Sequence, residues 1–402
     1  MIEHTRVHPG RLLICADLFA DIGNQVIGLF LINLLVFKGD SPVFGMVMMC
    51  VIHQVPSLFL SPLAGAGVDK TGARKWLMRV NLAKCFLVGL FAYVTSQQLL
   101  FPVYLAFIVA SLFFAIGRMS LAPMIVSKNR LIAFNALNER VAISGGIISP
   151  WIIGVMIEKW GQASALGAAF LLFAGSILLI AGIRVLPRKS DLPAMAPGPQ
   201  KDLRDNARPW AVPIKMDSSL KPYFLLLGFV LLGGGVLNLG LPLYLKNDLN
   251  INIAEWGFIM SAFQTGAFLS TCLLPRMKTT LKQGVFLPSW FLVLAGAMFL
   301  LPHATAPVQV SALMLLLGCG FTMLHIYWET MIQQNSPRHM LAKTMALLSS
   351  YKGACYLATI LCGALISVTW GAAAFIMLGS IAVGSACLFT PRVIKFNTGG
   401  LL

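Results

Sequence analysis

Residues 65–75 read Gly-Ala-Gly-Val-Asp-Lys-Thr-Gly-Ala-Arg-Lys and form a short polar loop between two apolar stretches, 42–66 and 77–97. Its glycines allow a tight turn, and its acidic residue lies among cationic partners where two helices end and begin. A bilayer core about 30 Å thick requires roughly 20 apolar residues of helix, and both stretches are long enough. The loop therefore predicts a helical hairpin that crosses a membrane twice.

The whole chain shares this character. Of its 402 residues, 58% are apolar and only 11% are charged, and the mean hydropathy is +0.82. A soluble domain has about 45–50% apolar and about 25% charged residues, so a soluble fold is excluded. Polar, proline-rich or glycine-rich breaks divide the chain into twelve apolar stretches: 11–37, 42–66, 77–97, 100–126, 139–158, 163–186, 222–245, 254–274, 284–302, 307–332, 344–367 and 370–390. The sequence predicts an all-α polytopic membrane protein with twelve transmembrane helices.

The long polar stretch 187–220 separates the first six helices from the last six. It contains six prolines and no helical apolar period, which indicates a linker. We therefore expect an N-terminal six-helix bundle (1–186), a linker (187–220) and a C-terminal six-helix bundle with a short tail (221–402).

The net charge of +16 is explained by membrane topology. In this division of the chain, 24 of the 30 Lys and Arg residues fall in segments on the side of the termini, Lys84 among them, and only Lys38, Lys159 and Lys246 lie in the opposite loops. Cytoplasmic loops carry the excess of Lys and Arg in membrane proteins. We therefore expect both termini and the linker in the cytoplasm, and no nucleic-acid partner is needed to explain the charge.

The loop at 65–75 resembles the signature of the major facilitator superfamily, Gly-x3-Asp-(Arg/Lys)-x-Gly-x-(Arg/Lys)-(Arg/Lys), and lies between the second and third spans as in that family. The matching residues, which the resemblance identifies as a conformational gate, are Gly65, Asp69, Lys70, Gly72, Arg74 and Lys75. The resemblance implies two pseudo-symmetric six-helix bundles, each built from inverted three-helix repeats. It also implies a substrate site between the bundles and transport by alternating access.

Residues 145–154 resemble a degraded form of the antiporter motif of the same family, Gly-x3-Gly-Pro-x2-Gly-Gly. Gly145, Pro150 and Gly154 match, whereas Ser149 and Ile153 replace two of its glycines. The motif implies export by exchange, and the alternative is ordinary close packing of small residues between helices. The segments 123–150 and 333–343 are similar to bacterial exporters of enterobactin-type siderophores and macrolides, which implies membership of that branch.

Ionisable residues at membrane depth are costly unless they are paired, so each is a functional candidate. In the first span, Asp17 and Asp21 lie one helical turn apart, and Asn24 and Gln25 extend this polar stripe. Two carboxylates this close repel each other when both are ionised, so they are candidates for proton coupling or for anchoring a cation; the alternative is a structural pair. Arg118 in the fourth span requires an anion, either a substrate group or Asp17, Asp21 or Glu139.

The second half contains a matching pair, because His325 and Glu329 lie one turn apart in the tenth span. Facing Lys352 of the eleventh span, they would form a cluster that titrates in the working pH range. The alternative is a structural salt bridge between Glu329 and Lys352. Together with Asn24, Gln25 and Arg118, the residues predicted to bind substrate are Asn238, Gln264, Tyr327, Trp328 and Lys352.

The sequence contains no phosphate-binding loop, nucleophile elbow or metal-ligand spacing, so we expect neither an enzyme nor an ATP-driven pump, and no cofactor or bound metal. The expected protein is a monomeric secondary active transporter of the bacterial inner membrane. Its partners would be the lipid bilayer, protons and a small organic solute such as a siderophore or drug, which it would export in exchange for protons. An uptake carrier, an iron or other metal transporter and a non-transporting receptor or assembly protein are the alternatives.

Overall fold

The computed structural model describes residues 9–60, 67–68, 70–94, 97–126, 131–183, 221–277, 283–335 and 341–390, and nearly all of them are helical. The first half consists of α1 (Pro9–Ile32), η1 (Asn33–Phe37, a π-helical turn), α2 (Pro42–Phe59), α4 (Ala73–Tyr93), α5 (Gln97–Ile125), α6 (Leu131–Trp160) and α7 (Gln162–Gly182). The second half consists of α8 (Lys221–Asn247), α9 (Ile253–Met277), α10 (Gln283–Leu300), η4 (Leu301–His303), α11 (Pro307–Asn335), α12 (Leu341–Ser385) and η6 (Ala386–Leu388).

Each of the twelve predicted spans overlaps a helix, and the last two are joined within α12. That helix contains a non-helical residue, Gly371, with φ = 86° and ψ = 164°. Gly161 separates α6 from α7 with nearly the same conformation, φ = 80° and ψ = 175°. Both glycines follow an exposed tryptophan, Trp160 and Trp370. A positive φ is accessible to glycine without steric cost, so a single residue makes each turn, at corresponding places in the two halves.

Several helix ends differ from their predicted positions. The fifth span begins at Leu131 rather than at 139, because the helix continues beyond the apolar core through a segment of mixed polarity. Among the described residues, eight helical segments are long and apolar enough to cross a membrane, and two more, 42–56 and 288–303, are shorter apolar helices. The linker 187–220 lies outside the described residues, so the domain boundary stays a prediction.

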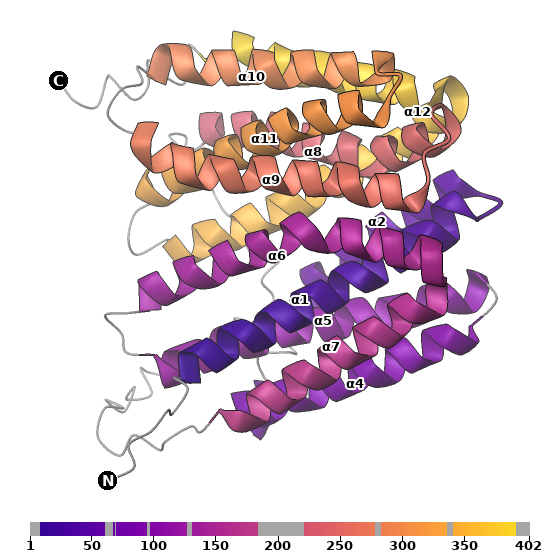
Figure 1. Ribbon diagram of the computed structural model, residues 1–402. Coiled ribbons are helices and arrows are strands. Elements are labelled where there is room, and N and C mark those ends of the chain that lie inside the picture. The colour runs from indigo at the N-terminus through magenta and orange to yellow at the C-terminus, as the bar shows by residue number, and fades with distance from the viewer. Residues whose placement is uncertain are drawn as a thin grey trace.

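The helices form two bundles that follow the order of the chain (Figure 1). In the first bundle, α1 packs against α6 and α7, and α4 packs between α5 and α7; in the second, α9 packs on α11 and α8 on α12. The bundles meet where α6 contacts α9 and where α2 contacts α12. The first described helix begins, and the last ends, at the same end of the molecule (Figure 1).

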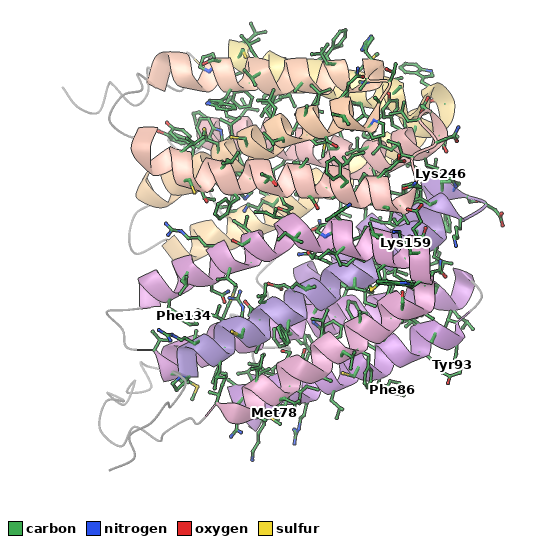
Figure 2. The ribbon with its side chains drawn as sticks, in the orientation of Figure 1. Met78, Phe86, Tyr93, Phe134, Lys159 and Lys246 are labelled. Carbon is green, nitrogen blue, oxygen red and sulfur yellow. The ribbon has the colours of Figure 1, made fainter. Side chains whose placement is uncertain are left out.

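At the other end, the two bundles are in direct contact. Lys246 Nζ of α8 donates a hydrogen bond to the Gly39 carbonyl at 3.3 Å. Asn252 Nδ2, just before α9, donates to Glu158 Oε1 of α6 at 3.4 Å. Figure 2 shows Lys159 and Lys246 together at this end, with Phe134 and Met78 toward the opposite end. The end opposite the start of α1 is therefore the closed end of the interface.

Candidate functional site

A cavity of about 540 Å³ lies between the two bundles. It is lined by α1, α2 and α6 of the first half and by α8, α9, α11 and α12 of the second. Most of its lining is apolar, including Leu29, Trp256 and Phe263. Its polar lining residues are Gln25, Asn238, Gln264, Thr322, His325 and Tyr356. Four of the predicted site residues, Gln25, Asn238, Gln264 and His325, are therefore brought together here from four helices.

The chemistry of this cavity differs from the sequence-based expectation in one respect. The described residues that line it include no Asp, Glu, Lys or Arg. Arg118 and Lys352 were expected to offer positive charge to a substrate, but neither is among the lining residues. The cavity presents amide, hydroxyl and imidazole groups within an apolar wall.

A second hollow of about 630 Å³ lies among α1, α4 and α7. All of its lining residues belong to the first half, and they are mainly apolar, such as Phe30, Phe91 and Phe170. Because it does not border the second bundle, relative motion of the two halves would not open or close it. The cavity between the bundles is therefore the candidate functional site.

An ionic network lies within the first bundle and joins α1, α5 and α6. Arg118 Nε on α5 lies 3.2 Å from Asp17 Oδ1 on α1, with side-chain exposures of 23% and 6%. Asn138 Nδ2 of α6 donates a hydrogen bond to the other Asp17 oxygen at 2.7 Å. Among the candidate anions, Asp17 thus contacts Arg118, and the structure adds Asn138, which was not predicted from the sequence.

The position of Lys84 differs from the predicted one, which placed it in a loop on the same side of the membrane as the termini. It lies near the middle of α4 and is completely buried. Its Nζ donates to Asn24 Oδ1 at 3.1 Å, and Ser111 Oγ donates to the same oxygen at 3.2 Å. Its position in the sequence does indicate burial, because Lys84 lies seven residues inside the predicted span 77–97. A lysine at this depth cannot reach the membrane surface easily.

The second bundle contains a smaller polar contact. Lys352 Nζ of α12 lies 3.2 Å from His325 Nε2 of α11, and that histidine faces the cavity. The side chain of Glu329 lies outside the described residues. Trp328 is completely buried and packs against Tyr223, with ring centroids 5.9 Å apart, and neither it nor Tyr327 lines the cavity. The substrate-binding roles of Tyr327 and Trp328 stay predictions.

Only part of the gate motif is described by the structure. Gly65 and Asp69 lie outside the described residues, whereas Lys70 and Lys75 are exposed. Gly72 has φ = 78° and precedes α4. Arg74 reaches the end of α7, where Nε donates to the Ile180 carbonyl at 3.2 Å and Nη2 donates to the Ala181 carbonyl. A cation at a helix C-terminus meets unpaired carbonyls and the negative end of the helix dipole, so Arg74 ties α4 to α7.

Replacing Arg74 by Ala is expected to destabilise the protein by about 1.5–3 kcal/mol, because two hydrogen bonds from a charged donor are lost. Thermal unfolding of the purified protein in detergent measures this effect. Lys75→Ala, which removes the neighbouring exposed cation, is the matched control and should change stability by less than about 0.5 kcal/mol. Equal effects of the two substitutions would show that the Arg74 contacts contribute nothing specific.

The antiporter-like segment lies where α6 crosses α9. Gly154 lies against the backbone of Ile253 and Ala254, and Gly257 of α9 lies against the carbonyl of Pro150. A side chain at either glycine would overlap backbone atoms of the other helix. Ser149 Oγ donates to Gln25 Oε1 of α1 at the cavity wall, and Gly145 faces Leu18. The small residues of this segment therefore allow the two bundles to approach backbone to backbone.

Comparisons with known proteins agree with this architecture. A family model described as Major Facilitator Superfamily matches residues 13–355. The structure is similar to a bacterial homologue of the iron transporter ferroportin in an inward-facing state, with 16% identity and a TM-score of 0.68 over 98% of this chain and 100% of that chain. It is also similar to the nucleoside transporter NupG, with 15% identity and a TM-score of 0.68 over 96% of this chain and 99% of that chain.

A peptide transporter POT has a TM-score of 0.73 at 10% identity, over 96% of this chain and 95% of that chain. These identities are low, so the structural likeness establishes the fold. A comparison with curated proteins yields no match. The family model covers most of the chain, from α1 into α12. The chain belongs to the major facilitator superfamily.

Proposed function

We propose that this protein is a proton-coupled secondary active transporter of the bacterial inner membrane that exports a small organic solute by alternating access. The observation that supports the proposal is the cavity between the bundles. Both halves line this cavity, and hydrogen bonds between the halves close it at one end. Rocking of the halves about such a cavity would expose it to each side of the membrane in turn. With both termini in the cytoplasm, as the charge distribution predicts, the described conformation would be inward-facing.

The lining favours an amphipathic, drug-like solute with few charges over a multiply charged catecholate siderophore. Apolar and aromatic side chains such as Trp256, Phe263 and Phe321 would contact a hydrophobic scaffold, while Gln25 and Asn238 offer both donors and acceptors. A solute with several negative charges would lose its hydration in this cavity without meeting a lysine or arginine among the described lining residues.

Proton coupling is supported by the position of Asp17. Its carboxylate is ionically paired with Arg118, and α1 also carries Gln25 and Leu29 to the cavity wall. Protonation of Asp17 would remove the attraction that holds Arg118, and α5 and α1 would then be free to shift relative to each other. His325, which contacts Lys352 at the opposite wall, is the second candidate for proton exchange.

The test uses protein reconstituted in liposomes with an imposed pH gradient. Radiolabelled macrolide, catecholate siderophore and ferrous iron are supplied in separate reactions, and both solute flux and internal pH are followed. Macrolide flux with opposite proton flux is expected. Siderophore or iron flux alone would assign another cargo, solute flux without proton movement would indicate a uniporter, and absence of flux with all three would favour a non-transporting role.

Gly28→Leu is expected to lower substrate affinity at least tenfold, which corresponds to about 1.4 kcal/mol. Gly28 lines the cavity, and a Cβ added there meets no atom within 4 Å, so leucine would occupy substrate space without disturbing the protein. Gly89→Leu is the matched control, because Gly89 is equally open but lines the second hollow. Equilibrium binding of labelled macrolide checks both variants. An equal loss of affinity in the two variants would contradict the assignment of this cavity as the substrate site.

A further inference from the structure

The antiporter-like segment of α6 presents two different faces. Gly146 and Gly154 lie on the face toward α9, since a Cβ added at either would meet atoms of that helix. Gly145 and Ser149, one turn apart, lie on the face toward α1, where Ser149 reaches Gln25. The residue that stands in place of a motif glycine therefore brings a hydroxyl group to α1 at the cavity wall.

This hydroxyl determines how the Gln25 amide is turned. Ser149 is only 7% exposed, and its Oγ donates to Gln25 Oε1. Among the residues that the structure describes, the Ser149 side chain has no other hydrogen bond. If the amide were reversed, its nitrogen would face the hydroxyl, and the hydroxyl proton would have no acceptor there. A buried donor without an acceptor is costly, so the amide oxygen faces α6.

The amide nitrogen of Gln25 is then available to a solute. Gln25 lines the cavity, and its Nε2 has no partner among the described residues. Solvent reaches this nitrogen, in contrast to Nδ2 of Asn33 and Nε2 of Gln162, which also lack a partner but are sealed. Gly28, one turn further along α1, lines the same cavity and has open space around it. The wall thus presents N–H donors in a fixed direction beside room for a ligand.

We propose that Ser149 is a positioning residue of the substrate site, which holds the Gln25 donors toward the cavity so that the transporter selects solutes with an acceptor oxygen. A carbonyl, ester or ether oxygen would pair with these donors. A solute that offers only donors at this point would leave the Gln25 N–H groups unpaired, and a site built to form a hydrogen bond rejects such a solute. This inference rests on the proposed function, and it specifies the class of solute.

A stability cycle tests the contact itself and requires no solute. Ser149→Ala is expected to lower the melting temperature of the purified protein, because Gln25 Oε1 loses its donor. In the Gln25→Met background the same substitution is expected to have no effect or to raise the melting temperature, because the hydroxyl has no acceptor left. Ser144→Ala, at an exposed serine of α6 that bonds only to its own helix, is the matched control. Equal losses in the two backgrounds would overturn the proposal.

Binding of labelled macrolide tests the positioning role. Gln25→Met is expected to weaken binding about threefold to tenfold, as for the loss of one neutral hydrogen bond. Ser149→Ala is expected to weaken it about twofold to fivefold, because a freely turning amide is competent only part of the time. No further loss is expected when Ser149→Ala is added to Gln25→Met, whereas the full loss should persist with Gln264→Met on the opposite wall. A loss that persists in the Gln25→Met background would show that Ser149 acts in another way and would overturn the proposal.

The acceptor preference is tested with two solutes of matched shape. Benzophenone and diphenylmethane share two phenyl rings and differ in the carbonyl oxygen, and each is used to displace labelled macrolide. The ratio of their affinities is expected to favour benzophenone more strongly in the wild type than in Ser149→Ala, and least in Gln25→Met. A ratio that is the same in all three proteins, or displacement by neither solute, would refute the acceptor assignment.

These measurements separate the inference from the function on which it rests. If the stability cycle shows coupling and the protein neither binds nor moves any solute, the proposed function fails and the orientation of the amide stands. If macrolide is transported but its affinity is insensitive to Gln25→Met and Ser149→Ala, the proposed function stands and this inference fails.

Discussion

Asp17→Asn is expected to abolish proton-coupled transport and to destabilise the protein by about 3–5 kcal/mol, the usual cost of removing one partner of a buried ion pair. Asparagine keeps the shape of the side chain but leaves Arg118 without the carboxylate 3.2 Å away. The amide also cannot exchange a proton. Unfolding in detergent measures the loss of stability, and substrate-driven proton release from purified protein measures the coupling.

Two further variants separate these effects. Asp248→Asn removes an exposed carboxylate at the closed end of the protein and is expected to leave both measurements unchanged. The double variant Asp17→Asn with Arg118→Gln removes both charges, so it should recover much of the stability while proton release stays absent. Proton release that persists in Asp17→Asn would refute the role of Asp17 and transfer the coupling to His325 and its neighbours.

Gly257→Leu is expected to force the two bundles apart at the closed end. Gly257 lies against the Pro150 carbonyl, and a Cβ would overlap that backbone rather than a movable side chain. Neither helix can yield locally, so the contact between α6 and α9 must open and the described conformation is disfavoured. Steric overlap in a packed contact typically costs about 1–3 kcal/mol, enough to shift a balanced two-state equilibrium by about fivefold to more than a hundredfold.

Distance measurements between spin labels at positions 40 and 248 check this prediction, because these exposed residues flank the contact between Gly39 and Lys246. The labels are placed in a variant whose eight native cysteines are replaced by serine. The distance is expected to increase in Gly257→Leu. Gly296→Leu, at a glycine with open space around it, serves as the control and should leave the distance unchanged. An unchanged distance in both would mean that the contact does not hold this end closed.

The helical architecture could be predicted from the sequence because membrane spans are determined by local composition. Each apolar stretch between polar breaks overlaps a helix, and the last two predicted spans, 344–367 and 370–390, which only two residues separate, are joined within α12. The start of α6 at Leu131 was not predictable in this way. Helices continue into polar sequence wherever the backbone hydrogen bonds persist, so hydropathy marks the membrane region and not the helix end.

The candidate site was only partly predictable, because pairing between helices depends on their rotation and relative height. Sequence spacing placed Asp17 and Asp21 on one face of α1, and that face does carry the ionic network. The sequence spacing allowed several possible anions for Arg118 and did not identify Asp17 as its partner. It also assigned Lys84 to a loop, because the excess of basic residues on one side concealed a single buried lysine. Asn138 gave no signal, since an asparagine near a helix end is usually solvated.

The matching turns at Trp160–Gly161 and Trp370–Gly371 have a consequence for biosynthesis. A single residue joins the two helices at each turn. We therefore expect that neither helix of a pair inserts into the bilayer while the other stays in water. Each pair must enter the lipid as a preformed helical hairpin, with the exposed tryptophan at the membrane interface, which such rings favour. These turns also leave no protruding loop into which an epitope tag or a protease site can be inserted without breaking the hairpin.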